Sequence, residues 1–86
     1  MKSINQLLDI MAQLRDPNHG CPWDAEQSFD SLTPYTIEEA YEVTDTIAQK
    51  DYVHLKEELG DLLFQVVFYS QIAKEKSLFE FKDVVK

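Results

Sequence analysis

Residues 52–75 form the segment that most constrains how this chain can fold. At 100° per residue, apolar side chains point in almost every direction around a helix of this sequence. They are Leu55, Leu59, Leu62, Leu63, Phe64, Val66, Val67, Phe68, Tyr69, Ile72 and Ala73. Such a helix is buried nearly all round, so the sequence predicts a helix over 52–75, continuing through Gly60, that other elements cover.

Two capping patterns predict helices near the N-terminus. Ser3, followed three residues later by glutamine, precedes apolar residues at helical spacing and predicts a helix over 4–15. The stretch RDPNHGCPWD then holds two of the three prolines and one of the two glycines, which indicates a loop. Asp24, again followed by glutamine after three residues, predicts a short helix over 25–31.

A second long helix is expected over 34–49, because Thr33 followed by Pro34 is a typical helix start. The stretch QKD then forms a turn, and Asp51 caps the helix over 52–75. No segment alternates at period two for long enough to be a strand, so the class is all-α. Two long helices joined by so short a turn form an antiparallel hairpin, and hairpins pair into bundles.

The length of 86 residues predicts a single domain, residues 1–86, that buries only about 60% of its unfolded surface. A partner chain, giving a homodimer or a higher homo-oligomer, is therefore expected. A further helix begins near Ser77 and Glu80 and is cut short at Lys86.

Charge and composition exclude several classes of protein. The net charge is -8, and the eight basic residues are scattered, which argues against a nucleic-acid-binding surface. No apolar run approaches the roughly 18 residues of a membrane span, and no signal peptide is visible. The single Cys21 excludes a disulfide framework within the chain. We expect a cytoplasmic protein without membrane contact.

Acidic residues lie where the 52–75 helix is otherwise apolar. Glu58, Asp61 and Gln65 fall within about 60° of one another, on a stripe that continues into Phe68 and Ile72. Ionised carboxylates in such surroundings cost several kcal/mol each unless they are paired or bind a metal ion. The alternative is that the acids near the helix start simply face water.

The 34–49 helix carries acidic residues opposite its apolar side, which taken alone is typical of a solvated face. In an antiparallel hairpin, however, Glu39 and Glu42 come to lie against Glu58 and Asp61. Four carboxylates around one point need a cation. Oxygen ligands favour a hard ion, Mg²⁺ or Mn²⁺, over zinc or copper, and Mg²⁺ usually binds phosphorylated ligands.

These residues form a recognisable pattern: Glu38-Glu39-x-x-Glu42, 15 intervening residues, then Glu58-x-x-Asp61. It resembles the EExxE...ExxD signature of the MazG-like all-α nucleoside triphosphate pyrophosphohydrolases. The stretches LRDPNHGCPWDAEQSF, LTPYTIEEAYE and EELGDLLFQVVFYSQIA also look like the N-terminal domain of the two in MazG proteins. The similarity covers nearly the whole chain.

The resemblance implies a reaction and roles for the acidic residues. A nucleoside triphosphate would be hydrolysed to monophosphate and pyrophosphate, as in enzymes that cleanse the nucleotide pool, with water attacking the α-phosphorus. Glu39, Glu42, Glu58 and Asp61 look like Mg²⁺ ligands. Glu38 is the candidate to orient or deprotonate the water, with help from Glu57.

The nucleotide-binding candidates are less sharply defined. Trp23 is a candidate to stack on a nucleobase, with Asp24 and Gln27 near the base or sugar, and equally a loop anchor. Lys56 would contact phosphate or form a surface pair. Arg15 is expected to interact with the C-terminus of its own helix rather than with phosphate.

One departure from the family pattern concerns the C-terminal end of the chain. MazG-like domains normally continue into a helix with basic residues, so the resemblance implies a truncated domain or a fragment lacking that helix. Two other functions remain open: a module that binds Mg²⁺ and nucleotide without turnover or regulates a partner, and a structural dimerisation bundle.

Overall fold

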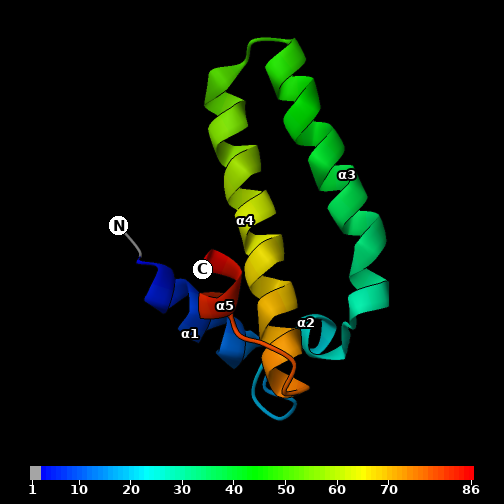
Figure 1. The fold of residues 1–86 in the computed structure, drawn as a ribbon. Coiled ribbons are helices and arrows are strands. Elements are labelled where there is room, and N and C mark those ends of the chain that lie inside the picture. Colours follow the sequence, from blue (N-terminus) through cyan, green and yellow to red (C-terminus); the bar gives the residue numbers. More distant parts are fainter. Residues whose placement is uncertain (1–2) are drawn as a thin grey trace.

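The computed structural model describes residues 3–86, which form five helices and no strand (Figure 1). In chain order they are α1 (Ile4–Leu14), α2 (Pro22–Glu26), α3 (Phe29–Ala48), α4 (Tyr52–Glu75) and α5 (Phe81–Val85). The predicted all-α class is confirmed, and the bounds of α1 and α4 agree with prediction to within one residue. Within residues 3–86 no helix is long and apolar enough to cross a membrane.

Helices α3 and α4 form the predicted antiparallel hairpin (Figure 1). The chain reverses at Lys50, whose φ of 56° is left-handed. Asp51 caps α4 as expected, because its carboxylate accepts a hydrogen bond of 3.2 Å from the backbone N–H of His54. Local turn and capping chemistry therefore determines where α4 begins.

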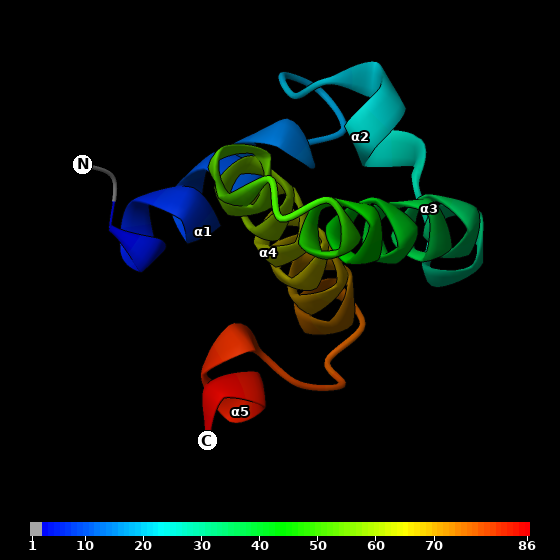
Figure 2. The same ribbon diagram turned by 90° about the horizontal axis from the view of Figure 1, so that it is seen from above.

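The hydrophobic core lies at the end of the hairpin remote from this turn. Helix α4 runs between α1 and α3 (Figure 2), and the largest fully buried side chains come from these three helices. They are Met11, Leu32, Val67 and Ile72. The expectation that α4 is buried nearly all round is wrong for the single chain: Leu59 and Leu63 remain 47% and 42% exposed, because α1 covers only its second half.

Helix α3 begins at Phe29, five residues before the predicted start. Ser28 and Ser31 form a capping box, and Pro34 lies inside the helix rather than at its start. Pro34 has no N–H to donate to the carbonyl of Asp30. The hydroxyl of Thr33 donates to that carbonyl instead, at 2.9 Å, which explains why the helix continues through the proline.

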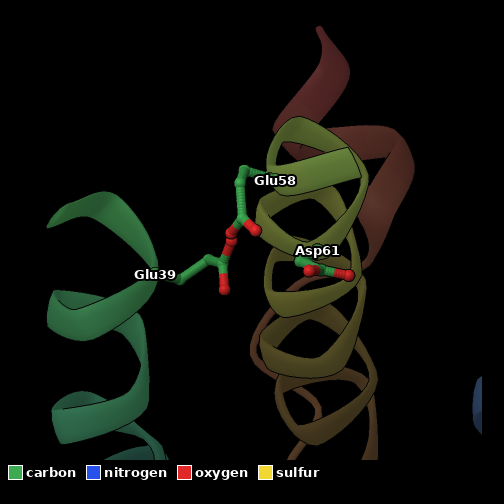
Figure 3. Close-up of side chains that lie close together, drawn as sticks. All are labelled: Glu39, Glu58 and Asp61. Carbon is green, nitrogen blue, oxygen red and sulfur yellow. The ribbon is translucent and has the colours of Figure 1, made fainter. Parts of the chain in front are cut away.

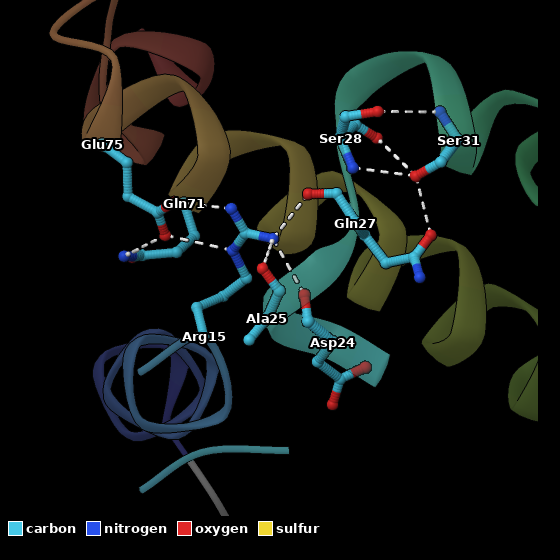
Figure 4. A network of polar contacts seen from close by, with 8 residues as sticks. All are labelled: Arg15, Asp24, Ala25, Gln27, Ser28, Ser31, Gln71 and Glu75. Carbon is cyan, nitrogen blue, oxygen red and sulfur yellow. Dashed lines mark hydrogen bonds and ion pairs between the residues drawn. The ribbon is translucent and has the colours of Figure 1, made fainter. Parts of the chain in front are cut away.

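The predicted short helix over 25–31 is also wrong, because α2 starts earlier, at Pro22, and ends at Glu26. Pro22 occupies the first helical position, where no N–H is needed. Arg15 closes the other end. Its guanidinium donates to the carbonyls of Asp24 and Gln27 at 2.8 and 2.7 Å, and to that of Ala25 (Figure 4).

Arg15 therefore interacts with the C-terminus of α2, not with that of its own helix as expected. The same guanidinium forms an ion pair of 2.5 Å with Glu75 near the end of α4. A single buried cation thus ties α1, α2 and α4 together. Helix α5 follows the N-cap residue Glu80, close to the predicted start of the final helix.

Candidate metal centre

Three carboxylates converge where α3 faces α4. Glu39 projects from α3 toward Glu58 and Asp61 of α4 (Figure 3). One carboxylate oxygen from each of the three lies within 4.8 Å of the other two. The spacing of three residues between Glu58 and Asp61 places both on one side of α4. The structure thus brings together three of the four predicted metal ligands.

Two oxygen atoms of this group are buried without a hydrogen bond. Oε1 of Glu39 and Oε2 of Glu58 have no partner among residues 3–86. Buried polar atoms nearly always have a partner, and an ionised carboxylate without one is costly. A divalent cation that prefers oxygen ligands would satisfy both atoms, so the residues present fit Mg²⁺ or Mn²⁺.

The electrostatics of the group point the same way. The pKa of Glu39 is raised from 4.5 to about 8, first by burial and then by the contact with Glu58 and the charges of Asp61 and Glu42. The pKa of Glu42 is also raised, chiefly by its hydrogen-bonding contact with Glu58. Like charges at short range disfavour ionisation, and a bound cation reverses that preference.

The remaining predicted acids surround the group without joining it. Glu42 is exposed and lies outside the set of three, although it contacts Glu58. Glu38 and Glu57 are exposed as well. The charge of Glu38 contributes to the raised pKa of Glu42. The predicted metal-binding role of Glu42 and the predicted water-activating roles of Glu38 and Glu57 therefore stay predictions.

The predicted nucleotide-binding residues lie in two places. Trp23 is 48% exposed, and its ring lies nearly perpendicular to those of Tyr35 and Phe68, with centroid distances of 5.6 and 6.5 Å. Lys56 is exposed on α4 near the turn and forms no ion pair within residues 3–86. Both aromatic neighbours anchor Trp23 and leave part of its ring free.

Gln27 and Asp24 belong to the structure around α2. The amide nitrogen of Gln27 donates to the carbonyl of Trp23 at 2.9 Å, and its amide oxygen accepts from Ser31 at 2.7 Å (Figure 4). The backbone carbonyl of Asp24 binds Arg15. The Gln27 side chain therefore has a structural role, and ligand binding by either residue stays a prediction.

A polar cluster one helical turn from the carboxylates was not assigned from the sequence. Thr36 donates to the amide oxygen of Gln65 at 2.8 Å and is hydrogen bonded to the hydroxyl of Tyr69. Thr36 precedes Glu39 by three residues, and Gln65 follows Asp61 by four. That spacing was the available signal, because it places both residues on the sides that carry the carboxylates.

Comparison with known proteins identifies a family for this chain. Residues 27–86 match the family model described as the MazG nucleotide pyrophosphohydrolase domain. The chain is 58% identical over 84 residues to an Escherichia coli protein named nucleoside triphosphate pyrophosphohydrolase, covering 98% of this chain. It is 49% identical over 83 residues, 96% of the chain, to a Thermotoga maritima nucleoside triphosphate pyrophosphohydrolase/pyrophosphatase.

A third relative carries no activity in its name. It is the uncharacterized protein YabN of Bacillus subtilis, 47% identical over 77 residues, or 90% of this chain and 16% of its own length. The matched region covers 32% of the Escherichia coli and Thermotoga maritima proteins, so the chain spans about a third of these relatives. The family model matches residues 27–86, and three residues of the acidic signature, Glu39, Glu58 and Asp61, lie together; the chain belongs to the MazG nucleotide pyrophosphohydrolase domain family.

Proposed function

We propose that this domain hydrolyses nucleoside triphosphates to nucleoside monophosphate and pyrophosphate in a Mg²⁺-dependent reaction. The observation that carries the proposal is the pair of buried oxygens of Glu39 and Glu58 without hydrogen-bond partners, beside Asp61. The names of two relatives, each a nucleoside triphosphate pyrophosphohydrolase, support the same reaction.

Glu39, Glu58 and Asp61 would hold the ion, with Glu42 close enough to complete the set. When bound, Mg²⁺ supplies positive charge for the polyphosphate oxygens, and Mn²⁺ has the same ligand preference. These carboxylates would hold the ion where α3 faces α4. Without a cation, a polyanionic substrate would be repelled by them.

Acidic side chains of this chain would also orient and deprotonate the attacking water. A water oxygen forms a bond to the α-phosphorus while the bond from that phosphorus to the bridging oxygen breaks, and pyrophosphate leaves with the electron pair. Glu38 orients the water and accepts its proton, assisted by Glu57. Both side chains are exposed and can reach solvent water.

The rest of the nucleotide would extend toward α2. The free part of the Trp23 ring stacks on the base, with Asp24 and Gln27 near the base or sugar, and Lys56 contacts phosphate. We further propose a homodimer that covers the exposed apolar side chains of the hairpin, such as Ile37 and Tyr41, which are 69% and 75% exposed. The protein would act on the cytoplasmic nucleotide pool, without binding nucleic acid or membrane.

The direct test is the product formed from a mixture of nucleoside triphosphates and Mg²⁺. We expect pyrophosphate and monophosphate as first products, and no product with Glu58→Gln or in EDTA. Glu26→Gln is the matched control, because Glu26 is an exposed acid outside the carboxylate group. Orthophosphate as the first product would contradict this reaction.

Thermal melting separates catalysis from the two other functions. A binding module would melt higher with Mg²⁺ and nucleotide, and not in EDTA, while forming no product. A structural dimerisation bundle would keep or gain stability in Glu58→Gln, because one buried charge disappears without loss of a ligand.

A further inference from the structure

Contacts between α3 and α4 succeed one another in a fixed order along the hairpin. Glu39 faces Glu58 and Asp61 first, nearest the turn. Thr36 and Gln65 form the next contact. The aromatic contacts that bring Trp23 of α2 against α3 and α4 come after it. Acidic, amide and aromatic groups thus follow one another in this order along the hairpin.

Within residues 3–86, the side-chain amide of Gln65 is hydrogen bonded through its oxygen and not through its nitrogen. A hydroxyl has one proton to give, so the Tyr69 hydroxyl can donate to Thr36 while Thr36 donates to Oε1 of Gln65 at 2.8 Å. A longer contact of 3.2 Å joins Thr36 to the carbonyl of Leu32. The amide nitrogen of Gln65 makes no hydrogen bond to any of residues 3–86 and is not buried.

The order of these contacts matches the order of parts in a nucleotide. At 1.5 Å per residue, Gln65 lies about 6 Å along α4 from Asp61, and Phe68, which contacts Trp23, about 10 Å. With the phosphates at the carboxylates and the base at Trp23, the sugar falls at the level of Gln65. An amide nitrogen with two free N–H groups is a donor suited to sugar oxygens.

From this arrangement we propose that the side-chain amide of Gln65, oriented by Thr36 and Tyr69, donates a hydrogen bond to a sugar hydroxyl of the nucleotide and discriminates among sugars. The inference rests on the proposed function and extends it, because it assigns the sugar-binding group. Gln65 is a binding residue here, and Thr36 is a positioning residue that fixes the amide.

The test compares ligands with and without a sugar. Dissociation constants in Mg²⁺ would be measured calorimetrically for inorganic triphosphate and for α,β-methylene nucleoside triphosphates with ribose, 2′-deoxyribose and 2′,3′-dideoxyribose. Gln65→Met removes the donor with little change of volume or charge. We expect it to weaken binding of the ribonucleotide analogue about tenfold and to leave inorganic triphosphate unchanged.

The sugar series gives the sharper result. Where the ligand lacks the contacted hydroxyl, Gln65→Met should cost no affinity, so the two deletions are not additive. Thr36→Val should weaken the same ligands by a smaller factor, since the amide remains but loses its orientation. Gln13→Met is the matched control, because Gln13 is exposed on α1, and it should change no affinity.

Equal weakening by Gln65→Met for ribose and dideoxyribose analogues would overturn the sugar assignment while leaving the proposed function intact. Equal weakening for inorganic triphosphate would overturn it too, since the effect would then arise at the carboxylates. If the unaltered protein bound neither nucleotide nor triphosphate in Mg²⁺, both the proposed function and this inference would fail.

Discussion

The two ends of the hairpin differ in what covers them. At the core end, the second half of α4 is packed against α1 and the start of α3, and Val67, Phe68 and Ile72 are at most 2% exposed. At the turn end, α3 is the one element among residues 3–86 that lies beside the first half of α4, and Leu59 and Leu63 stay partly exposed. Leucine, valine and phenylalanine together number five in the first half, residues 52–63, and four in the second, residues 64–75. The number of these apolar residues therefore does not decide burial, which follows the neighbouring elements.

The carboxylate group lies at the less covered end. Glu39 and Glu58 each have one buried oxygen without a partner, next to exposed apolar side chains. The core end can stabilise itself through apolar burial, whereas the turn end carries like charges at short range. A bound cation would compensate the carboxylates of the turn end, and a partner chain would cover its exposed apolar side chains.

Truncation of a core side chain should cost most. Ile72→Ala should lower the free energy of unfolding by about 2–5 kcal/mol, because it leaves a cavity among Met11, Leu32 and Val67. Leu59→Ala is the matched change at the turn end and should cost less than about 1 kcal/mol. Urea unfolding, at a concentration where sedimentation shows single chains, measures both. Equal costs would abolish the distinction between the two ends.

Removal of the cation that joins three helices should come next. Arg15→Met should cost about 2–3 kcal/mol, because Glu75 and the carbonyls at the end of α2 lose a charged donor in a site where Arg15 is only 8% exposed. Lys74→Met breaks an exposed pair of 3.9 Å with Glu80 and should cost under about 1 kcal/mol. Urea unfolding followed by Trp23 fluorescence measures the loss; a cost no larger than that of Lys74→Met would contradict the bridging role.

The turn end should show a pH dependence of its own. The pKa of Glu39 is raised from 4.5 to about 8, so the folded state binds more protons than the unfolded state between these values. In EDTA the free energy of unfolding should therefore fall as the pH rises through this window. We expect a loss on the order of 1 kcal/mol, reduced by solvent screening. Saturating Mg²⁺ should remove the fall, because a cation favours the ionised form.

The matched variants identify the group responsible. Glu39→Gln should abolish most of the fall in EDTA, whereas Glu26→Gln, which removes an exposed acid on α2, should preserve it. Urea unfolding near pH 5 and near pH 8 is sufficient. Stability that stays constant with pH in EDTA would show that Glu39 ionises as readily in the folded chain as in the unfolded one, and stability that rises with pH would show that it ionises more readily in the folded chain.

Features determined by neighbouring residues could be predicted from the sequence. The start of α4 depends on Lys50 and Asp51 alone, and it was predicted to the residue. The meeting of Glu39 with Glu58 was predictable as well, because a short turn leaves the hairpin little freedom of register. In both cases the relevant contacts lie close in sequence or follow from one turn.

Features that depend on distant contacts could not be predicted. The start of α3 was misplaced because Pro34 is a typical first helical residue, and the compensating bond from Thr33 to Asp30 has no sequence signature. The ion pair of Arg15 with Glu75 joins residues 60 apart in the chain. Exposure of the turn end was missed for the same reason, since which neighbour covers a helix is a property of the whole fold.

The smallest expected effect is a gain at the turn end. Gly60 lies inside α4 with a φ that is not left-handed, and a Cβ built there meets no atom within 4 Å. Gly60→Ala should therefore raise the free energy of unfolding by about 0.5–1 kcal/mol, because alanine loses less conformational freedom in a helix. Urea unfolding of single chains measures this gain. If the substitution instead weakens the proposed homodimer or Mg²⁺-dependent nucleotide binding, a partner or ligand must approach the backbone beside Asp61. The absence of a side chain at Gly60 would then serve that close approach.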